Sequence, residues 1–176
     1  GPKLRPTDFG VNVEGKAEPR IYEARNGAPR ATILLAEDDP ALRDHTATLL
    51  SDIYRVIAAP DGLSAIALAK DHSPDLLVTD IQMPGMDGIE LTKRFRALPN
   101  NRMAPVLMLT TFGNVEDKLA GFEAGAIDYI HKPFEPDELR ARVRSQLAIR
   151  TLALQLLETE KLAALGTLSA GLAHEI

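Results

Sequence analysis

The sequence predicts an α/β fold class, a doubly wound five-stranded parallel sheet that is followed by a long coiled-coil helix. Short apolar runs alternate with stretches of helical period over about 100 residues. Most of the short runs are apolar on both faces, which is typical of parallel strands that helices cover on each side. After residue 136 no further proline occurs, and only Gly166 and Gly171 interrupt the helical pattern.

The composition is that of a globular protein with a mild negative charge. The 176 residues are 45% hydrophobic and 26% charged, which is enough for a real core. The formal net charge of −5 and the 5% aromatic content argue against nucleic-acid binding. Cysteine is absent, which excludes disulfides and thiolate sites and fits a cytoplasmic location. No apolar run of about 18 residues occurs, so this segment is expected to make no membrane contact. A longer parent protein could still be anchored to a membrane by a segment before residue 1.

The elements follow from the pattern in chain order. Residues 1–30 hold four prolines and four glycines and are predicted to be a linker or arm, in which Gly1-Pro2 is typical of a remnant of tag removal. Strands are expected at residues 32–36, 54–58, 76–79, 106–109 and 127–130. Helices are expected near residues 40–51, 62–71, 87–97 and 115–124. Asp39, with Pro40 after it, supplies the N-cap of the first helix.

Residues with acidic, hydroxyl and ammonium groups follow the predicted strands. Glu37 and Asp38 come after the first strand, Asp80 after the third, Thr110 after the fourth and Lys132 after the fifth. In a doubly wound sheet these ends meet at one edge, where ligands bind. Clustered carboxylates repel one another, and a hard divalent cation such as Mg²⁺ relieves the repulsion. A carboxylate nucleophile, a metal ion and an ammonium group are the parts of a metal-assisted phosphoryl acceptor.

Four segments resemble, in order and spacing, the signatures of response-regulator receiver domains. They are residues 33–40, 79–88, 109–111 and 128–134. The resemblance implies a flavodoxin-like receiver with strand order 2-1-3-4-5 over residues 31–134, and a last helix that starts near residue 135. It also implies two-component signal transduction, with an upstream histidine kinase or phosphotransfer protein as the phosphodonor.

The same resemblance assigns the nucleophile and the metal ligands. Asp80 matches the residue that becomes an aspartyl phosphate. Glu37, Asp38 and Asp80, with the backbone carbonyl of Gln82, match the ligands of Mg²⁺ or Mn²⁺. Asp39 falls one place beyond the acidic pair and is interpreted as the helix cap.

Three further residues match groups that respond to the phosphoryl group. Lys132 matches the lysine that contacts it, and Thr110 matches the hydroxyl that bonds to it. Tyr129 matches an aromatic residue that changes rotamer together with the threonine. The Lys132-Pro133 peptide bond is expected to be cis, which proline makes tolerable.

Residues 135–176 are predicted to form a long dimerisation helix. Apolar spacings of 3, 4 and 7 recur, and no breaker allows the helix to fold back, so a homodimer through residues from about 139 to 176 is expected. The stretch 160–176 resembles the start of the phosphoacceptor helix of histidine kinases. That resemblance implies His174 as a kinase phosphoacceptor, with Glu175 beside it to orient the imidazole.

The two resemblances together predict a receiver, phosphorylated on Asp80, that regulates a C-terminally linked histidine kinase through a dimeric coiled coil. The chain is expected to be a truncated front part of a hybrid sensor kinase, because it stops just after His174. No nucleotide-binding motif is visible, so the chain itself is expected to accept phosphate without acting as a kinase.

Two alternatives stay open. One is a stand-alone response regulator whose output is a coiled-coil interaction. The other is an Asp-nucleophile hydrolase, although such enzymes normally carry a second acidic residue two positions after the nucleophile, where this chain has Gln82. A DNA-binding output is not expected, because no helix-turn-helix or basic patch follows residue 134.

Overall fold

Five parallel strands form the centre of the sheet in the computed structural model, which describes residues 17–111 and 115–174. They are β2 (Thr32–Ala36), β3 (Arg55–Ala59), β4 (Leu76–Asp80), β5 (Val106–Thr110) and β6 (Asp128–His131). Their spatial order is β3-β2-β4-β5-β6, and each neighbouring pair is parallel. This order is the predicted 2-1-3-4-5 arrangement of a flavodoxin-like receiver fold.

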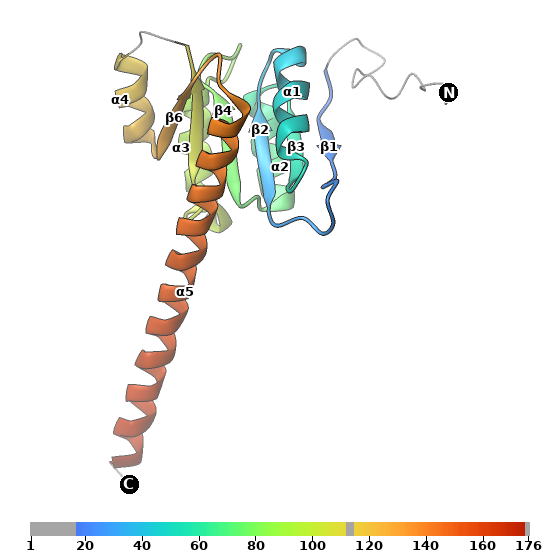
Figure 1. The fold of residues 1–176 in the computed structure, drawn as a ribbon. Coiled ribbons are helices and arrows are strands. Elements are labelled where there is room, and N and C mark those ends of the chain that lie inside the picture. Colours follow the sequence, from blue (N-terminus) through green and yellow to red (C-terminus); the bar gives the residue numbers. More distant parts are fainter. Residues whose placement is uncertain (1–16, 112–114, 175–176) are drawn as a thin grey trace.

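The predicted count of five strands is wrong, because a sixth strand lies at the edge of the sheet. Strand β1 (Arg20–Tyr22) pairs antiparallel with β3 and makes the full order β1-β3-β2-β4-β5-β6. It has only three residues, and none of them is buried, so no apolar run marks it in the sequence. Its pairing with β3 satisfies backbone groups at the edge of the parallel sheet. Figure 1 shows β1 at this edge.

Side chains next to β1 hold the arm against the domain. The Tyr22 hydroxyl donates to Asp44 Oδ1 at 2.7 Å, and the Arg25 guanidinium pairs with Asp52. Part of the predicted linker is therefore docked. Residues 1–16, including the Gly1-Pro2 pair, lie outside the described residues.

Helices cover both faces of the sheet, as the pattern predicts. Helix α1 (Pro40–Leu50) and the first turns of α5 (Pro136–His174) pack on one face with residues such as Ile33 and Leu35. Helices α2 (Gly62–His72) and α3 (Gly88–Ala97) pack on the other face with Leu34. Neighbouring residues of one strand thus enter opposite cores, because successive side chains of a strand point to opposite faces. Helix α4 (Val115–Ala124) lies on the same side as α3, and the short helix η2 (Pro99–Asn101) follows α3.

Local features at the strand ends position the site. Asp39 caps α1 by accepting hydrogen bonds from the amides of Ala41 and Leu42, as predicted. The Lys132-Pro133 peptide bond is cis, also as predicted. A β-carbon on Gly88 would lie 2.0 Å from the carbonyl oxygen of Asp80, so glycine lets α3 begin directly against the end of β4.

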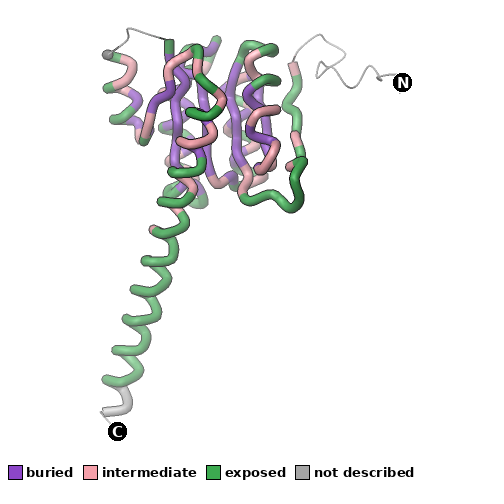
Figure 2. The backbone as a smooth tube through the Cα atoms, in the orientation of Figure 1, coloured by how far each residue is buried: buried purple, intermediate pink, exposed green. Residues whose placement is uncertain are grey.

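Helix α5 has 39 residues and leaves the domain after its first turns. Leu139 and Val143 are fully buried, whereas every residue from 154 to 171 is exposed (Figure 2). The predicted start near residue 135 agrees with the observed start at Pro136. Across the described ranges, none of the helices combines the length and the apolar character that a membrane span requires.

Candidate functional site

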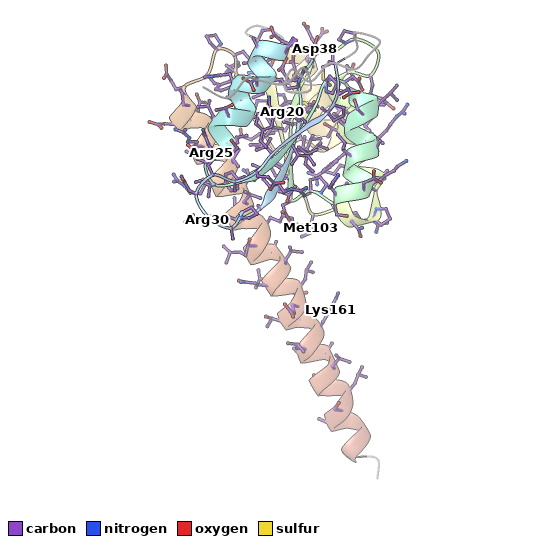
Figure 3. All side chains as sticks on the ribbon, turned by 90° about the vertical axis from the view of Figure 1, so that its right-hand side faces the viewer. Arg20, Arg25, Arg30, Asp38, Met103 and Lys161 are labelled. Atoms are coloured by element: carbon purple, nitrogen blue, oxygen red, sulfur yellow. The ribbon has the colours of Figure 1, made fainter. Side chains whose placement is uncertain are left out.

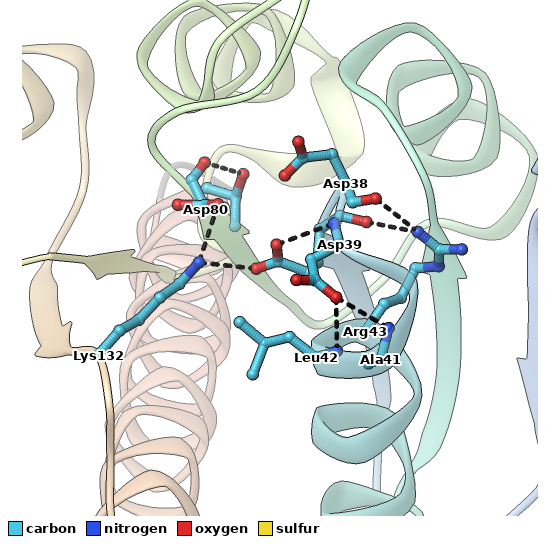
Figure 4. A network of polar contacts seen from close by, with 9 residues as sticks. Asp38, Asp39, Ala41, Leu42, Arg43, Asp80 and Lys132 are labelled. Carbon is cyan, nitrogen blue, oxygen red and sulfur yellow. Dashed lines mark hydrogen bonds and ion pairs between the residues drawn. The ribbon is translucent and has the colours of Figure 1, made fainter.

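The predicted site residues meet at the carboxyl ends of the strands. Glu37 and Asp38 directly follow β2, Asp80 ends β4, Thr110 ends β5 and Lys132 follows β6. Figure 4 shows the carboxylates of the β2 and β4 ends with the Lys132 side chain reaching between them. The sequence places these residues there because each follows a buried apolar strand in a parallel sheet.

Three carboxylates form an acidic cluster. One carboxylate oxygen each from Glu37, Asp38 and Asp80 lies within 4.8 Å of the other two. The exposed fraction is 1% for Glu37 and 9% for Asp80, whereas Asp38 is exposed, so the cluster extends from the interior to solvent. These oxygen ligands, with solvent access on one side, fit a small divalent cation that keeps several waters. Asp39 has its carboxylate engaged in the α1 cap instead.

Lys132 bridges the two buried carboxylates. Its Nζ lies 3.0 Å from Glu37 Oε2 and 2.8 Å from Asp80 Oδ2. Burial raises the pKa of Glu37 to about 7, and the charge of Asp80 adds to this, while the hydrogen bond from Lys132 opposes it. Burial alone would lower the pKa of Lys132, but its hydrogen bonds to Asp80 and Glu37 raise it. The ammonium group therefore stays charged and offsets the repulsion within the cluster.

The turn after β2 is held by an arginine that sequence reasoning missed. Arg43 Nη1 donates to the carbonyl oxygen of Glu37 at 2.9 Å and to that of Asp38 at 3.3 Å. The amide of Asp39 donates to Glu37 Oε1 at 3.2 Å. Arg43 lies in α1, which starts shortly after the acidic pair. This closeness in sequence was the only signal that Arg43 would contact the turn.

A small cavity lies beside Asp80. It has a volume of about 110 Å³, and its lining includes Thr110, Lys132, Gln82 and Asp117. Thr110 is 4% exposed, and its hydroxyl donates to the carbonyl oxygen of the next residue at 3.0 Å. The size suits a phosphoryl group better than an extended substrate. Asp117, on α4, was not predicted as a site residue, because its helix does not follow the strands that carry the acidic cluster.

Tyr129 does not line this cavity in the structure. It is 8% exposed, and its hydroxyl donates to the backbone carbonyl of Lys118 on α4. Its ring packs edge-to-face on Phe122 with 4.8 Å between centroids. Burial raises the pKa of Tyr129, so the phenol stays protonated. The predicted switch residue is thus packed inward against α4, beside rather than within the cavity.

The second predicted phosphoacceptor lies at the far end of α5. The helix ends at His174, well away from the sheet edge that carries Asp80 (Figure 1). The structure does not bring these two residues together. Glu175 lies outside the described residues.

The fold and the acidic edge together define a receiver-type phosphoacceptor domain. A family model for the response regulator receiver domain matches residues 33–144, and the chain belongs to this family. The match begins in β2 and ends inside α5.

Several known proteins are similar to this chain. It is 42% identical over 116 residues to the DNA-binding dual master transcriptional regulator RpaA of Synechocystis sp.. The match covers 65% of this chain and 48% of that protein. The chain thus spans about half the length of the curated relatives it matches. A putative response regulator from Chloroflexus aurantiacus has a crystal structure that is 42% identical, with a TM-score of 0.64, covering 68% of this chain and 98% of that one.

A third relative carries a metal ion. The receiver domain of the sensor histidine kinase PA1611 from Pseudomonas aeruginosa was crystallised with a magnesium ion coordinated in the active site cleft. It is 31% identical, with a TM-score of 0.63, and the match covers 67% of this chain and 98% of that one. The acidic cluster of this chain has the ligand chemistry that such an ion requires.

Proposed function

We propose that this chain is a receiver of a two-component system in which Asp80 accepts a phosphoryl group from a phosphohistidine on a histidine kinase or phosphotransfer protein. The observation that carries the proposal is the Asp80 carboxylate, which lies against Lys132 at 2.8 Å within the acidic cluster. An Asp80 oxygen forms a bond to phosphorus while the phosphorus–nitrogen bond of the donor breaks. The donor histidine keeps the electron pair and takes up a proton.

The neighbouring residues prepare Asp80 for this transfer. Glu37, Asp38, Asp80 and the backbone carbonyl of Gln82 would hold Mg²⁺ or Mn²⁺, which when bound supplies positive charge to the phosphoryl oxygens. Lys132 provides a second positive charge at the same carboxylate. In place of its present hydrogen bond, the Thr110 hydroxyl would donate to a phosphoryl oxygen, with Tyr129 as the residue that moves alongside it.

Chemical phosphorylation tests this proposal. The chain is incubated with acetyl phosphate and Mg²⁺, and the modified residue is located by mass spectrometry after borohydride reduction. We expect modification of Asp80 in the wild-type chain and in Asp39→Asn, and none in Asp80→Asn. The Asp39→Asn control is matched because asparagine also caps helices well. Modification at any other carboxylate, or retention of the label in Asp80→Asn, would overturn the assignment.

For the output we favour a stand-alone response regulator over a linked kinase. RpaA, which is 42% identical in the aligned region, is described as a transcriptional regulator, so regulators of this kind are near relatives. The family match ends at residue 144, before the exposed part of α5, and the chain has a net charge of −5, so we propose no nucleic-acid contact by this segment itself. We also propose that this regulator is located in the cytoplasm.

We propose that residues from about 139 to 176 form the dimerisation helix of that regulator, separate from a receiver domain at 31–134. Seven exposed leucines support pairing, because an isolated helix gains little from them in water. They are Leu152, Leu154, Leu156, Leu157, Leu162, Leu165 and Leu168. Sedimentation should give a dimer for the wild-type chain and a monomer for the double variant Leu157→Glu/Leu165→Glu. Leu63→Glu, at an exposed leucine on α2, is the control that should remain dimeric. A monomeric wild-type chain would contradict the proposal.

A linked histidine kinase is the second candidate, and one observation supports it. Helix α5 runs without a break as far as His174, where the resemblance to the kinase phosphoacceptor helix lies. In this candidate Glu175 would orient the His174 imidazole. The gene sequence beyond the codon for Ile176 separates the two candidates: a kinase ATP-binding domain supports this one, and a DNA-binding domain excludes it.

A further inference from the structure

A second cavity lies at the amino ends of the strands, on the edge of the sheet opposite to Asp80. Its volume is about 240 Å³. Tyr54 immediately precedes β3 and Asp75 immediately precedes β4, and both line the cavity. Arg30 lines it from the arm before β2. Figure 3 shows Arg30 at the lower edge of the domain, beside α5, and Asp38 at the upper edge.

The root of α5 forms the other wall. Arg144, Leu147 and Arg150 lie on the part of this helix that still contacts the domain, and all three line the cavity. The cavity therefore lies between the N-terminal arm and the point where α5 leaves the sheet. It shares no lining residue with the cavity beside Asp80.

The lining carries a surplus of positive charge. Three arginines and one carboxylate give a net charge of 3 − 1 = +2. The carboxylate of Asp75 is already engaged, because it accepts from Arg150 Nη1 and from the amide of Thr32, both at 2.8 Å. The side chains of Arg30 and Arg144 make no hydrogen bond or ion pair with any residue that the structure describes. Two of the three positive charges are thus left without a counter-charge in the described chain.

One buried donor in the lining has no acceptor among the described residues, and a tyrosine hydroxyl lies beside it. Arg150 Nε is buried and has no hydrogen-bond partner in the described structure. Tyr54 is 5% exposed, and no described group bonds its hydroxyl. Burial raises the pKa of Tyr54, against the opposing influence of Arg144 and Arg30, so the hydroxyl keeps its proton at neutral pH and can donate it. Buried donors are normally satisfied, so the unpartnered Arg150 Nε points to a missing acceptor.

We propose that this cavity binds a small oxyanion of the phosphate or carboxylate class, held by Arg30, Arg144 and Arg150 with the Tyr54 hydroxyl as an additional donor. Guanidinium groups match the geometry of such oxyanions and bind them through paired donors. The volume is below that of sites for drug-sized ligands, which start at about 300 Å³, so the ligand has few heavy atoms. An anion that bridges Arg30 and Arg144 would tie the arm to the root of α5. The cavity would then be an effector site that acts on the output helix independently of Asp80.

The test follows backbone amide signals of the full chain by NMR during titration with orthophosphate and, separately, with succinate. Sodium chloride keeps the ionic strength constant, so that general screening does not change. We expect saturable shifts at the cavity residues. The affinity for the anion should fall by about tenfold or more in the double variant Arg30→Gln/Arg144→Gln. Both arginines are exposed and unpaired with described residues, so the double variant should retain the fold.

Arg102→Gln is the matched control. Arg102 is an exposed arginine in the loop before β5, at the amino ends of the strands, and it does not line the cavity. Figure 3 shows its sequence neighbour Met103 at the lower edge of the domain. Tighter binding of orthophosphate would identify a phosphate-type ligand, and tighter binding of succinate a carboxylate-type ligand. Either result supports the proposal if the affinity for the anion is unchanged in Arg102→Gln.

Three results would overturn it. They are the absence of saturable shifts with both anions, equal weakening in Arg102→Gln and in the double variant, and shifts confined to Thr110 and Lys132. The last result would mean that the anions bind only beside Asp80.

Discussion

A β-carbon on Gly121 would lie 1.8 Å from the hydroxyl oxygen of Tyr129. The inward position of Tyr129 against α4 therefore depends on glycine at this point of the helix. Glycine costs helix stability, because its unfolded backbone has more freedom to lose. Here that cost makes room for the phenol and for its hydrogen bond to the carbonyl of Lys118.

Gly121→Ala should destabilise the protein by about 1–3 kcal/mol, because Tyr129 must shift and lose burial and its hydrogen bond. The sign is opposite to helix propensity, which favours alanine by about 1 kcal/mol. Urea denaturation measures the change. The loss should shrink in a Tyr129→Phe background, since the closest atom is then absent.

Gly166→Ala is the control for this prediction. Gly166 lies in exposed α5, and no atom comes within 4 Å of a β-carbon placed there. This variant should be stabilised by up to about 1 kcal/mol. Equal effects at the two glycines would contradict the steric explanation.

Asp38 and Asp39 are neighbours with different predicted roles. Asp38→Asn should weaken Mg²⁺ binding by about tenfold or more, while the free energy of unfolding changes by less than about 0.5 kcal/mol. Asp39→Asn should leave both quantities unchanged, because asparagine replaces the N-cap acceptor. Asp39→Ala should lose about 1 kcal/mol of stability and keep its Mg²⁺ affinity. Calorimetric titration measures the affinity, and equal losses in Asp38→Asn and Asp39→Asn would contradict the assignment.

Lys132→Ala leaves Glu37, which is 1% exposed, next to Asp80 without a counter-charge. We expect a loss of about 1–2 kcal/mol at neutral pH, because the Lys132 bridge is lost and the pKa of Glu37 rises further, so that this buried carboxyl must take up a proton beside Asp80. Added Mg²⁺ should restore part of the stability by supplying the missing charge. Urea denaturation with and without Mg²⁺ measures both effects. Lys93→Ala, at an exposed lysine, is the control, and similar stability of the two variants would refute the prediction.

All three tyrosines have pKa values above their ordinary value of 10.0. Burial, with the hydrogen bond to Asp44, raises the pKa of Tyr22 to about 12. Because the folded state favours the neutral phenol, the contribution of Tyr22 to stability is complete below about pH 10 and is lost as the pH rises through about 12.

Absorbance titration of phenolate checks this prediction. The native protein should form little phenolate near pH 10, whereas the urea-unfolded chain should titrate there. Tyr22→Phe should lose less stability than the wild-type chain between pH 10 and 12. A native titration near pH 10 that involves all three tyrosines would contradict the raised pKa values.

Much of the fold is encoded in local pattern. The five parallel strands, the start of α5 and the Asp39 cap follow from apolar runs and cap residues that are close together in sequence, whereas the strand order was implied by the resemblance to receiver domains. The site edge is predictable for the same reason, because Glu37, Asp38, Asp80, Thr110 and Lys132 each lie at the carboxyl end of a strand or just after it. Strand β1 was missed because three unburied residues carry no periodic signal, and pairing with β3 alone defines it.

The sequence by itself determined the receiver architecture and the set of acidic, hydroxyl and basic groups at its edge, because strand periodicity and position after a strand are local properties. Only the tertiary structure decided how these groups meet: that Lys132 bridges Glu37 and Asp80, that Tyr129 packs against α4 over Gly121, and that unpaired arginines from the arm and α5 share one cavity. Such relationships join residues far apart in the chain, and the packing of helices on the sheet sets their distances, which no local pattern records.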